Sequence, residues 1–404
     1  MQQFRSKDDY DRIRNEWVDR LTSYFIQNES GLLQKKDKTA IREKAAEWLM
    51  QYKIGEKEAR NIADIYIRRA FGYGDIEPLL ADPSISDIAI YGPGRVWVKR
   101  NGKHEESNIS FRTAKDVDQF ITTVATKLKI SLSAVEALVT KTDRESNDNA
   151  ILRVSIVSKK LTSSECHNIH FRKTMKDKVT LDDLIARKMI DDKLARYLTK
   201  CSRESSGMIF CGRGAAGKTT IMNALIDQIS PQDSVAIIQE NEELFTNEHK
   251  ATYMWHVDIG AGESRVSYTL QDLARQALLM DIDYFIIGEV KGAEARHIIT
   301  AANTGTTCWC TVHANNSKEA LGKLADYIKS HPDYSHSVQA DILPMLVSLR
   351  TVVFLKKYKV EEISEVVGID RVRDELIYKT IYDRSDVKNP WKIDPDAPDD
   401  KFLE

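Results

Sequence analysis

The sequence contains no run of eighteen apolar residues, and residues 1–14 are polar and charged. A membrane-spanning helix needs roughly 20 apolar residues, and a signal peptide needs an apolar core. These absences predict a cytoplasmic protein that is not itself inserted in a membrane. Internal repeats and low-complexity tracts are also lacking, and 404 residues are enough for two or three domains with ordinary cores.

An excess of charge of either sign is absent too, because 59 Lys and Arg residues stand against 61 Asp and Glu residues. This balance gives no support to a general polyanion-binding role, so nucleic acid is not expected as a direct ligand. Cysteine is scarce and odd in number, and the five residues lie in or beside apolar runs: Cys166, Cys201, Cys211, Cys308 and Cys310. That placement favours packing of reduced thiols over zinc binding or disulfides.

What the sequence does contain is a phosphate-binding pattern in the middle of the chain. Residues 208–211 are apolar and predict a buried strand, residues 212–219 match G-x-x-x-x-G-K-[ST], and apolar residues recur at helical spacing over 221–229. Strand, loop and helix in this order predict a nucleotide site. The predicted binding residues are Gly212, Arg213, Gly214, Ala215, Ala216, Gly217, Lys218, Thr219 and Thr220.

Each residue type in this loop has a physical reason to be there. Glycines allow the backbone N–H groups and the positive end of the following helix to approach phosphate closely. Lys218 is expected to neutralise charge on the β- and γ-phosphates, and the Thr219 hydroxyl to complete the shell of a Mg²⁺ ion that otherwise keeps waters. The expected ligands are therefore ATP and Mg²⁺.

The apolar pattern divides the chain into four regions. Residues 1–72 predict a helical region, with an apolar stripe on the first helix and an interruption of the second at Gly55. Residues 73–175 predict an α+β domain of short alternating strands and an amphipathic helix after Thr113. A charged linker follows at 176–190. The helical region is expected to pack on its neighbour rather than to dock a partner.

Residues 191–404 predict an α/β domain, because buried strands alternate with helices. The predicted strands are 208–211, 235–238, 284–287 and 308–312. Such alternation is typical of a mostly parallel sheet covered on both faces, which is the architecture of P-loop ATPases. In these sheets ligands lie at the carboxyl ends of the strands.

Polar residues follow three of the predicted strands. Glu240 and Glu243 follow 235–238, Glu289 follows 284–287, and His313 follows 308–312. A carboxylate at this edge can orient or deprotonate water, and acids there can approach a metal, which makes Glu240 a candidate Mg²⁺ ligand beside Thr219. The alternatives are a solvated acidic loop, a helix cap at Glu289 and a structural histidine at His313. Gly288 stands where many P-loop proteins have an aspartate.

The phosphate loop and the three strand ends together resemble the type II/type IV secretion ATPases, most closely the branch that powers tight-adherence pili. The resemblance covers about residues 73–370. It also rests on these segments: Gly74–Pro83 with Ser86–Ile88, Ile238–Leu244, Leu273–Leu278, Ile286–Gly292, Ala302–Gly305 and Thr311–Asn315.

The resemblance implies a RecA-like P-loop ATPase domain and a homo-hexameric ring. It implies that Glu289 is the catalytic glutamate, that Glu240 and Glu243 form an acid box near metal and water, and that His313 senses phosphate. Arginines of the preceding domain reach the nucleotide in this family, and Arg153 and Arg172 occupy matching strand-like places; each could equally be a surface arginine. Departures from the family pattern include the loop interior Arg213–Ala216, Gln239, Asp281-Ile282, Thr306 and Lys291.

Two hypotheses of different class follow. The first is an ATPase that hydrolyses ATP at the cytoplasmic face of the membrane and drives an inner-membrane platform protein of a secretion or pilus machine. The second is a nucleotide-dependent switch or scaffold of the same machinery with negligible turnover. A nucleic-acid translocase ranks last, because the sequence has no basic stripe with interleaved aromatics. Pilin, a secreted protein and conjugated DNA remain open as cargo.

Overall fold

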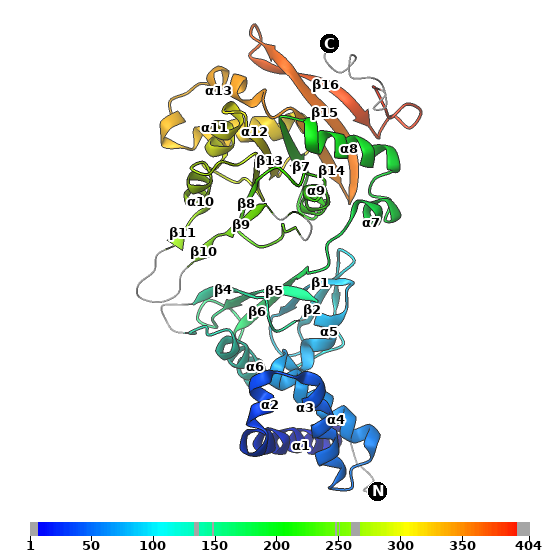
Figure 1. Cartoon of the computed structure of the whole chain (residues 1–404). Coiled ribbons are helices and arrows are strands. Elements are labelled where there is room, and N and C mark those ends of the chain that lie inside the picture. The colour runs from blue at the N-terminus through cyan, green and yellow to red at the C-terminus, as the bar shows by residue number, and fades with distance from the viewer. Residues whose placement is uncertain are drawn as a thin grey trace. The chain divides into compact units, whose positions relative to one another are not determined.

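The computed structural model describes residues 7–132, 137–147, 149–246, 249, 251–259 and 267–393. The chain forms two compact units, Met1–Asp177 and Lys178–Glu404. Figure 1 shows helices followed by a sheet in the first unit and a larger sheet between helices in the second. None of the described helices is long and apolar enough to cross a membrane.

The first unit begins with the predicted helical region. It consists of α1 (Lys7–Asn28), α2 (Ser30–Lys35), α3 (Lys38–Met50) and α4 (Glu56–Phe71). Leu21 and Phe25 of the predicted apolar stripe are fully buried against α3 and α4, whereas the side chain of Tyr10 lies outside the described residues. Gly55 is the N-cap of α4, which confirms the predicted interruption.

A six-stranded antiparallel sheet follows in the same unit, in the order β3-β2-β1-β6-β5-β4. The capping box of Thr113 and Asp116 starts the helix predicted after Thr113, and that helix packs Val117 and Ile121 on one face of the sheet. The elements are η1 (Gly74–Ile76), α5 (Glu77–Ala81), β1 (Ile85–Ile90), β2 (Val96–Arg100), β3 (Lys103–Glu106), α6 (Ala114–Lys127), β4 (Leu138–Asp143), β5 (Ala150–Val157) and β6 (Asn168–Met175).

A lysine joins the helical region to this α+β part. Lys127, at the end of α6, donates to the carbonyls of Phe71 and Gly72, at 2.7 Å each, where α4 ends. Its ammonium lies 4.4 Å from the centre of the Tyr73 ring. Cations at a helix C-terminus satisfy carbonyls that have no partner within the helix. The two parts of the first unit are therefore held together by charge as well as by packing.

The second unit contains an eight-stranded sheet in the order β16-β15-β14-β7-β13-β12-β8-β9. The six strands from β14 to β9 are parallel, and β15 and β16 are antiparallel, so the predicted mostly parallel α/β fold is confirmed. The strands are β7 (Gly207–Cys211), β8 (Val235–Gln239), β9 (Thr252–His256), β12 (Tyr284–Ile287), β13 (Thr307–Val312), β14 (Thr351–Lys356), β15 (Lys359–Asp370) and β16 (Glu375–Asp383), beside a small ribbon of β10 (Asp258–Ile259) and β11 (Ser267–Tyr268).

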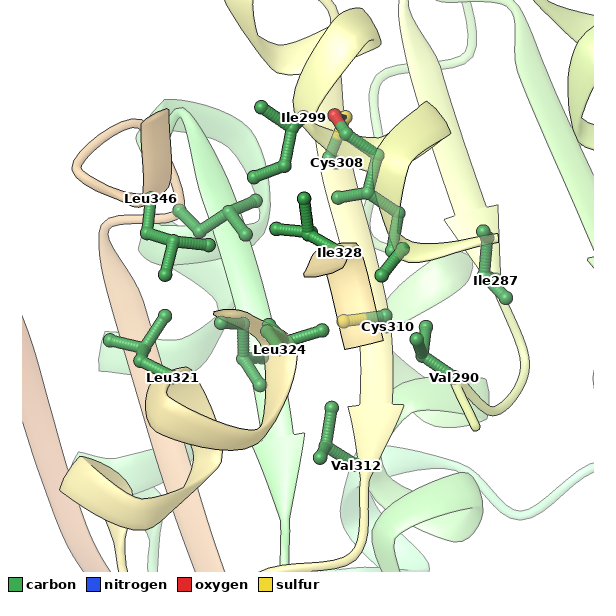
Figure 2. Packing of buried hydrophobic residues seen from close by; sticks show 14 of the residues in the cluster. Ile287, Val290, Ile299, Cys308, Cys310, Val312, Leu321, Leu324, Ile328 and Leu346 are labelled. Atoms are coloured by element: carbon green, nitrogen blue, oxygen red, sulfur yellow. Dashed lines mark hydrogen bonds between the residues drawn. The ribbon is translucent and has the colours of Figure 1, made fainter. Parts of the chain in front are cut away.

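Helices cover both faces of this sheet, so its central strands are buried throughout. Ile209 and Cys211 of β7 belong to one apolar cluster, which Figure 2 shows, and Met208 and Phe210 belong to the cluster on the other face. The helices are α7 (Leu181–Ala186), α8 (Asp192–Glu204), α9 (Lys218–Ile226), α10 (Leu270–Ala277), α11 (Ala295–Asn303), α12 (Ser317–Lys329), η2 (Pro332–Tyr334) and α13 (Gln339–Leu346). This burial explains the continuous apolar runs in the sequence.

A buried histidine on α11 predicts that stability falls in mild acid. Burial, together with the charges of Arg296, His331 and Arg275, lowers the pKa of His297 to about 4. Below pH 6.5 the unfolded chain takes up a proton there that the folded chain does not, so up to about 3 kcal/mol is lost as the pH falls from about 6.5 to about 4. Urea unfolding of the wild type and His297→Phe across this range checks this, because only the wild type should show the added slope.

Candidate functional site

The predicted phosphate loop connects β7 to α9 in a conformation that needs small residues. Backbone φ is positive at Gly212 (150°), Ala215 (58°) and Gly217 (98°). A Cβ atom added at Gly212 would lie 2.3 Å from the Leu355 carbonyl oxygen, so glycine is required there by space as well as by conformation. Gly217 is the N-cap of α9. The positive end of that helix therefore faces the space enclosed by the loop.

Lys218, the first residue of α9, is 7% exposed and folds back over this loop. Its ammonium donates to the carbonyls of Gly212 (3.1 Å) and Arg213 (3.2 Å). Burial lowers the pKa of Lys218, and the nearby carboxylates of Glu289 and Glu243 oppose this shift. The side chain is thus placed to exchange loop carbonyls for phosphate oxygens.

His313 connects the loop to the end of a neighbouring strand. Its Nδ1 atom lies 3.5 Å from Lys218 Nζ, and its Nε2 atom lies 2.6 Å from Glu289 Oε1. Partial burial and the charge of Lys218 lower the pKa of His313, which favours the neutral ring. A neutral imidazole with its proton on Nε2 suits both contacts. The structure therefore brings three of the predicted residues together.

Glu289 also meets a lysine that follows it in the sequence. Lys291 Nζ lies 3.1 Å from Glu289 Oε2 and 2.9 Å from Glu240 Oε2, so one ammonium bridges two of the predicted acids. Partial burial alone would lower the pKa of Lys291, but its hydrogen bonds to the two carboxylates raise it. Glu240, which follows β8, and Glu289, which follows β12, therefore both form an ion pair with Lys291.

The loop after β8 that carries Glu240 and Glu243, here called the acid loop, is held in place by two amide side chains. Gln239 accepts from the backbone N–H groups of Glu243 (3.0 Å) and Leu244 (2.8 Å) and donates to the Leu244 carbonyl (2.9 Å). Asn223 of α9 donates to the Glu243 carbonyl at 3.2 Å. A glutamate at position 239 would lack the N–H donor, so Gln239 suits this loop geometry.

Gly288 leaves little room for the aspartate that many P-loop proteins carry at this place. An added Cβ atom would lie 3.0 Å from Gln239 Cβ. The Gly288 carbonyl accepts from the Thr311 hydroxyl at 2.7 Å, and the Gly288 N–H group donates to the Ile238 carbonyl at 2.9 Å. The strand end is therefore fixed by its neighbours on both sides, and Glu289 follows at a defined position.

Arg153 and Arg172 lie in the other compact unit, as register partners on β5 and β6. Arg172 Nε lies 3.5 Å from Asp87 on the adjoining strand β1. Arg153 Nε is buried and has no hydrogen-bond partner within the described part of the chain. Both arginines belong to the sheet face opposite the buried Val154 and Phe171, so they share one surface of their own unit.

The residues of this site suit a Mg²⁺–nucleotide better than a metal cage made of protein alone. Among the described residues, no group of three or more His, Cys, Asp or Glu side chains is arranged to hold a metal ion. Mg²⁺ keeps several waters and is commonly bound by one or two protein oxygens together with phosphates. Thr219 in the first turn of α9 offers such a hydroxyl, and Glu240 offers a carboxylate.

The sequence pattern did not reveal the roles of Lys291, Gln239 and Asn223. In the sequence, Lys291 and Gln239 are recognisable only as residue types that depart from the family pattern, although their contacts fix the two acidic strand ends. Asn223 lies in the helix after the phosphate loop and gave no signal. The available clue was a polar residue within the apolar run Ile221–Ile226 of this helix, where Asn223 is 8% exposed.

A phosphate loop at the edge of a RecA-like sheet, with Glu289 and His313 beside its lysine, defines the class of P-loop nucleotide-binding proteins. The model of the type II/IV secretion system protein family matches residues 70–349. The chain therefore belongs to the type II/IV secretion ATPase family, which confirms the predicted resemblance at this level.

Individual relatives have low sequence identity to this chain. An uncharacterized protein of Methanocaldococcus jannaschii is 24% identical over 347 residues, which are 85% of this chain and 60% of that protein. A protein of Mycobacterium tuberculosis, provisionally named a conjugal transfer protein, is 28% identical over 280 residues, 66% of this chain and 78% of its own length. The crystal structure of the pilus retraction motor PilT with ADP has a TM-score of 0.51 and 16% identity, with 76% of this chain and 81% of PilT covered. This last likeness concerns the fold.

Proposed function

We propose that this protein hydrolyses ATP, with Mg²⁺, to power assembly or export by a type II/IV secretion, tight-adherence pilus or conjugation-like machine. The observation that carries the proposal is the series of contacts from Lys218 through His313 to Glu289 beside the phosphate loop. Phosphoryl transfer to water uses a cation that neutralises the phosphate and a residue that orients or deprotonates the water, and Lys218 and Glu289 supply these two groups.

Different residues of the site bind phosphate, hold the metal and accept the proton of water. The loop N–H groups and Lys218 bind phosphate and neutralise its charge, and Thr219 and Glu240 hold the metal, which supplies further charge stabilisation when bound. Glu289 orients the attacking water and accepts its proton. His313 senses the γ-phosphate through Lys218 and Glu289. The carboxylate of Glu243 lies close enough to Lys218 to oppose the lowering of the Lys218 pKa by burial.

In the proposed machine six copies form a ring, and Arg153 and Arg172 stabilise charge on the transferred phosphoryl group. Their side-by-side register and the buried, unpartnered Nε atom of Arg153 support this role. We further propose that the ring works at the cytoplasmic face of the membrane on an inner-membrane platform protein. Pilin, a secreted protein and the DNA of a conjugation machine are the candidate cargoes.

A nucleotide-dependent switch is the second candidate function. The observation that favours it is the acid loop, where Glu240 is paired with Lys291 and both ends of the Gln239 amide are engaged by the loop itself. An acid held in this way is less free to adjust to water and metal. Such a protein binds ATP and changes shape without turnover.

Steady-state ATP hydrolysis with and without Mg²⁺, measured together with ATP binding and the mass in solution, separates the two functions. The proposed ATPase turns over only with Mg²⁺, and its mass is a multiple of 46.0 kDa that fits six copies. Saturable ATP binding without turnover in any oligomeric state would overturn the hydrolysis proposal in favour of the switch. Failure to bind ATP would overturn both.

Lys291→Met is expected to lower kcat about 10-fold with little change in KM for ATP. The reason is that Glu289 and Glu240 lose the ammonium that holds both, while no contact to the phosphate loop is removed. Lys291→Arg is the matched control and should keep most of the wild-type rate, because a guanidinium can also span two carboxylates. Equal rates for the methionine variant and the wild type would contradict this positioning role.

A further inference from the structure

The β14–β15 turn places an exposed aromatic side chain against the phosphate loop. β14 is the parallel neighbour of β7, with Phe354 opposite Cys211, so the residues after both strands emerge at the same edge of the sheet. The turn residues Lys357 and Tyr358 connect the paired residues Lys356 and Lys359. Ligands of parallel sheets lie at such carboxyl ends.

Backbone contacts fix this turn to the loop. The Tyr358 N–H group donates to the Ala216 carbonyl at 3.1 Å. A Cβ atom added at Gly217 would lie 3.2 Å from Tyr358 Cδ1, so the edge of the ring lies directly beside the residue that precedes Lys218. Despite these contacts, Tyr358 is 52% exposed. One part of the ring touches the loop while the rest remains open to a ligand.

The turn has an unusual composition for its conformation. Lys357 (φ 50°) and Tyr358 (φ 58°) both adopt the left-handed conformation, which two-residue turns of this type normally fill with Asn and Gly. A long cationic and an aromatic side chain in these places cost conformational free energy. Lys356, Lys357 and Lys359 are exposed and form no ion pair among the described residues, so the turn is strongly positive next to an anion site.

From this arrangement we propose that Tyr358 stacks on the base of the nucleotide whose phosphates the loop binds, with the turn lysines adding attraction for the anion. The inference rests on the proposed nucleotide-binding function and adds the subsite for the base. A nucleotide held at the start of α9 extends its ribose and base away from the phosphates, toward neighbouring strand ends. Stacking on an aromatic ring tolerates every base, so this subsite binds ATP and GTP alike.

The test compares ligands with and without a base, using the full chain. Calorimetry measures the Kd of Mg-ATP, Mg-GTP and inorganic tripolyphosphate for the wild type, Tyr358→Asn and Tyr358→Phe. Asparagine suits the left-handed turn conformation, so the first variant removes the ring while the turn is kept. Tyr253→Asn is the matched control, since Tyr253 is 44% exposed and lies on β9, the edge strand at the opposite side of the sheet.

Tyr358→Asn is expected to weaken ATP and GTP binding by roughly 10-fold, within the range of about 5- to 150-fold that one base stack provides. Tripolyphosphate binding should stay within about twofold of the wild type, and Tyr358→Phe and Tyr253→Asn should bind all three ligands normally. Lys218→Ala is expected to abolish tripolyphosphate binding. This loss would show that tripolyphosphate occupies the phosphate loop.

Two results would overturn the base subsite and leave the proposed function standing. In one, Tyr358→Asn binds ATP as tightly as the wild type. In the other, it loses ATP and tripolyphosphate affinity equally, so Tyr358 only supports the loop. A wild-type chain that binds neither ATP nor tripolyphosphate would instead overturn the proposed function, and the base subsite with it.

Discussion

Glu289→Gln is expected to lower kcat for ATP hydrolysis by about 10²- to 10⁴-fold, the usual contribution of a general base. Glutamine has the same shape and retains an oxygen for Lys291, which lies 3.1 Å from the carboxylate, but an amide cannot accept the proton of the attacking water. The Kd for ATP should therefore change little. Steady-state hydrolysis and calorimetric ATP binding on the same preparation measure the two effects separately.

Glu242→Gln is the matched control for this substitution. Glu242 belongs to the neighbouring acid loop, but its carboxylate lies 3.1 Å from His256 Nδ1 rather than beside Lys218 or Lys291. This variant should keep most of the wild-type rate. If Glu289→Gln hydrolysed ATP at the wild-type rate, Glu289 would not be the base, and the acids near Glu240 would need to be tested in its place.

Gly212→Ala is expected to destroy the phosphate loop. The new methyl group would lie 2.3 Å from the Leu355 carbonyl oxygen, at a backbone φ of 150° that side chains rarely adopt. Strain and overpacking together should lower the free energy of unfolding by about 3 kcal/mol. The Kd for ATP should rise at least about 100-fold, because the carbonyls and N–H groups around Lys218 are displaced. Urea unfolding and calorimetry measure the two quantities.

Gly214→Ala distinguishes a specific clash from a general sensitivity of the loop. A Cβ atom added at Gly214 would have His313 Cε1 as its nearest neighbour, at 3.7 Å, which is an ordinary van der Waals separation. This variant should lose far less stability and affinity than Gly212→Ala. Similar losses in the two variants would contradict the steric explanation for Gly212.

The central features of the site could be predicted because they are local in the sequence. The phosphate loop follows from the residue order over 212–220, and the polar strand ends at Glu240, Glu289 and His313 follow from apolar runs that stop abruptly. Parallel strands bring those ends to one edge of a sheet. The contacts of Lys218 with His313, and of His313 with Glu289, agree with that expectation.

Other features depend on contacts between distant segments, which periodicity does not reveal. The bridge from Lys291 to Glu240 spans 51 positions, and the bond from Asn223 to the Glu243 carbonyl spans 20. The strands β14 to β16 were not predicted individually, although the run Thr351–Lys356 has a β-rich composition. Without them, the Lys357-Tyr358 turn could not be placed beside the phosphate loop, because its residues are not typical of turns.

The Lys127 contact at the end of α4 has a mechanical consequence. The Lys127 ammonium donates to the carbonyls of Phe71 and Gly72, at 2.7 Å each, and lies over the ring of Tyr73. These contacts restrain bending between α4 and the α+β part of the unit. Removal of the Lys127 side chain would leave the carbonyls of Phe71 and Gly72 without this donor and would loosen the junction between helices α1 to α4 and the β-sheet of the same unit.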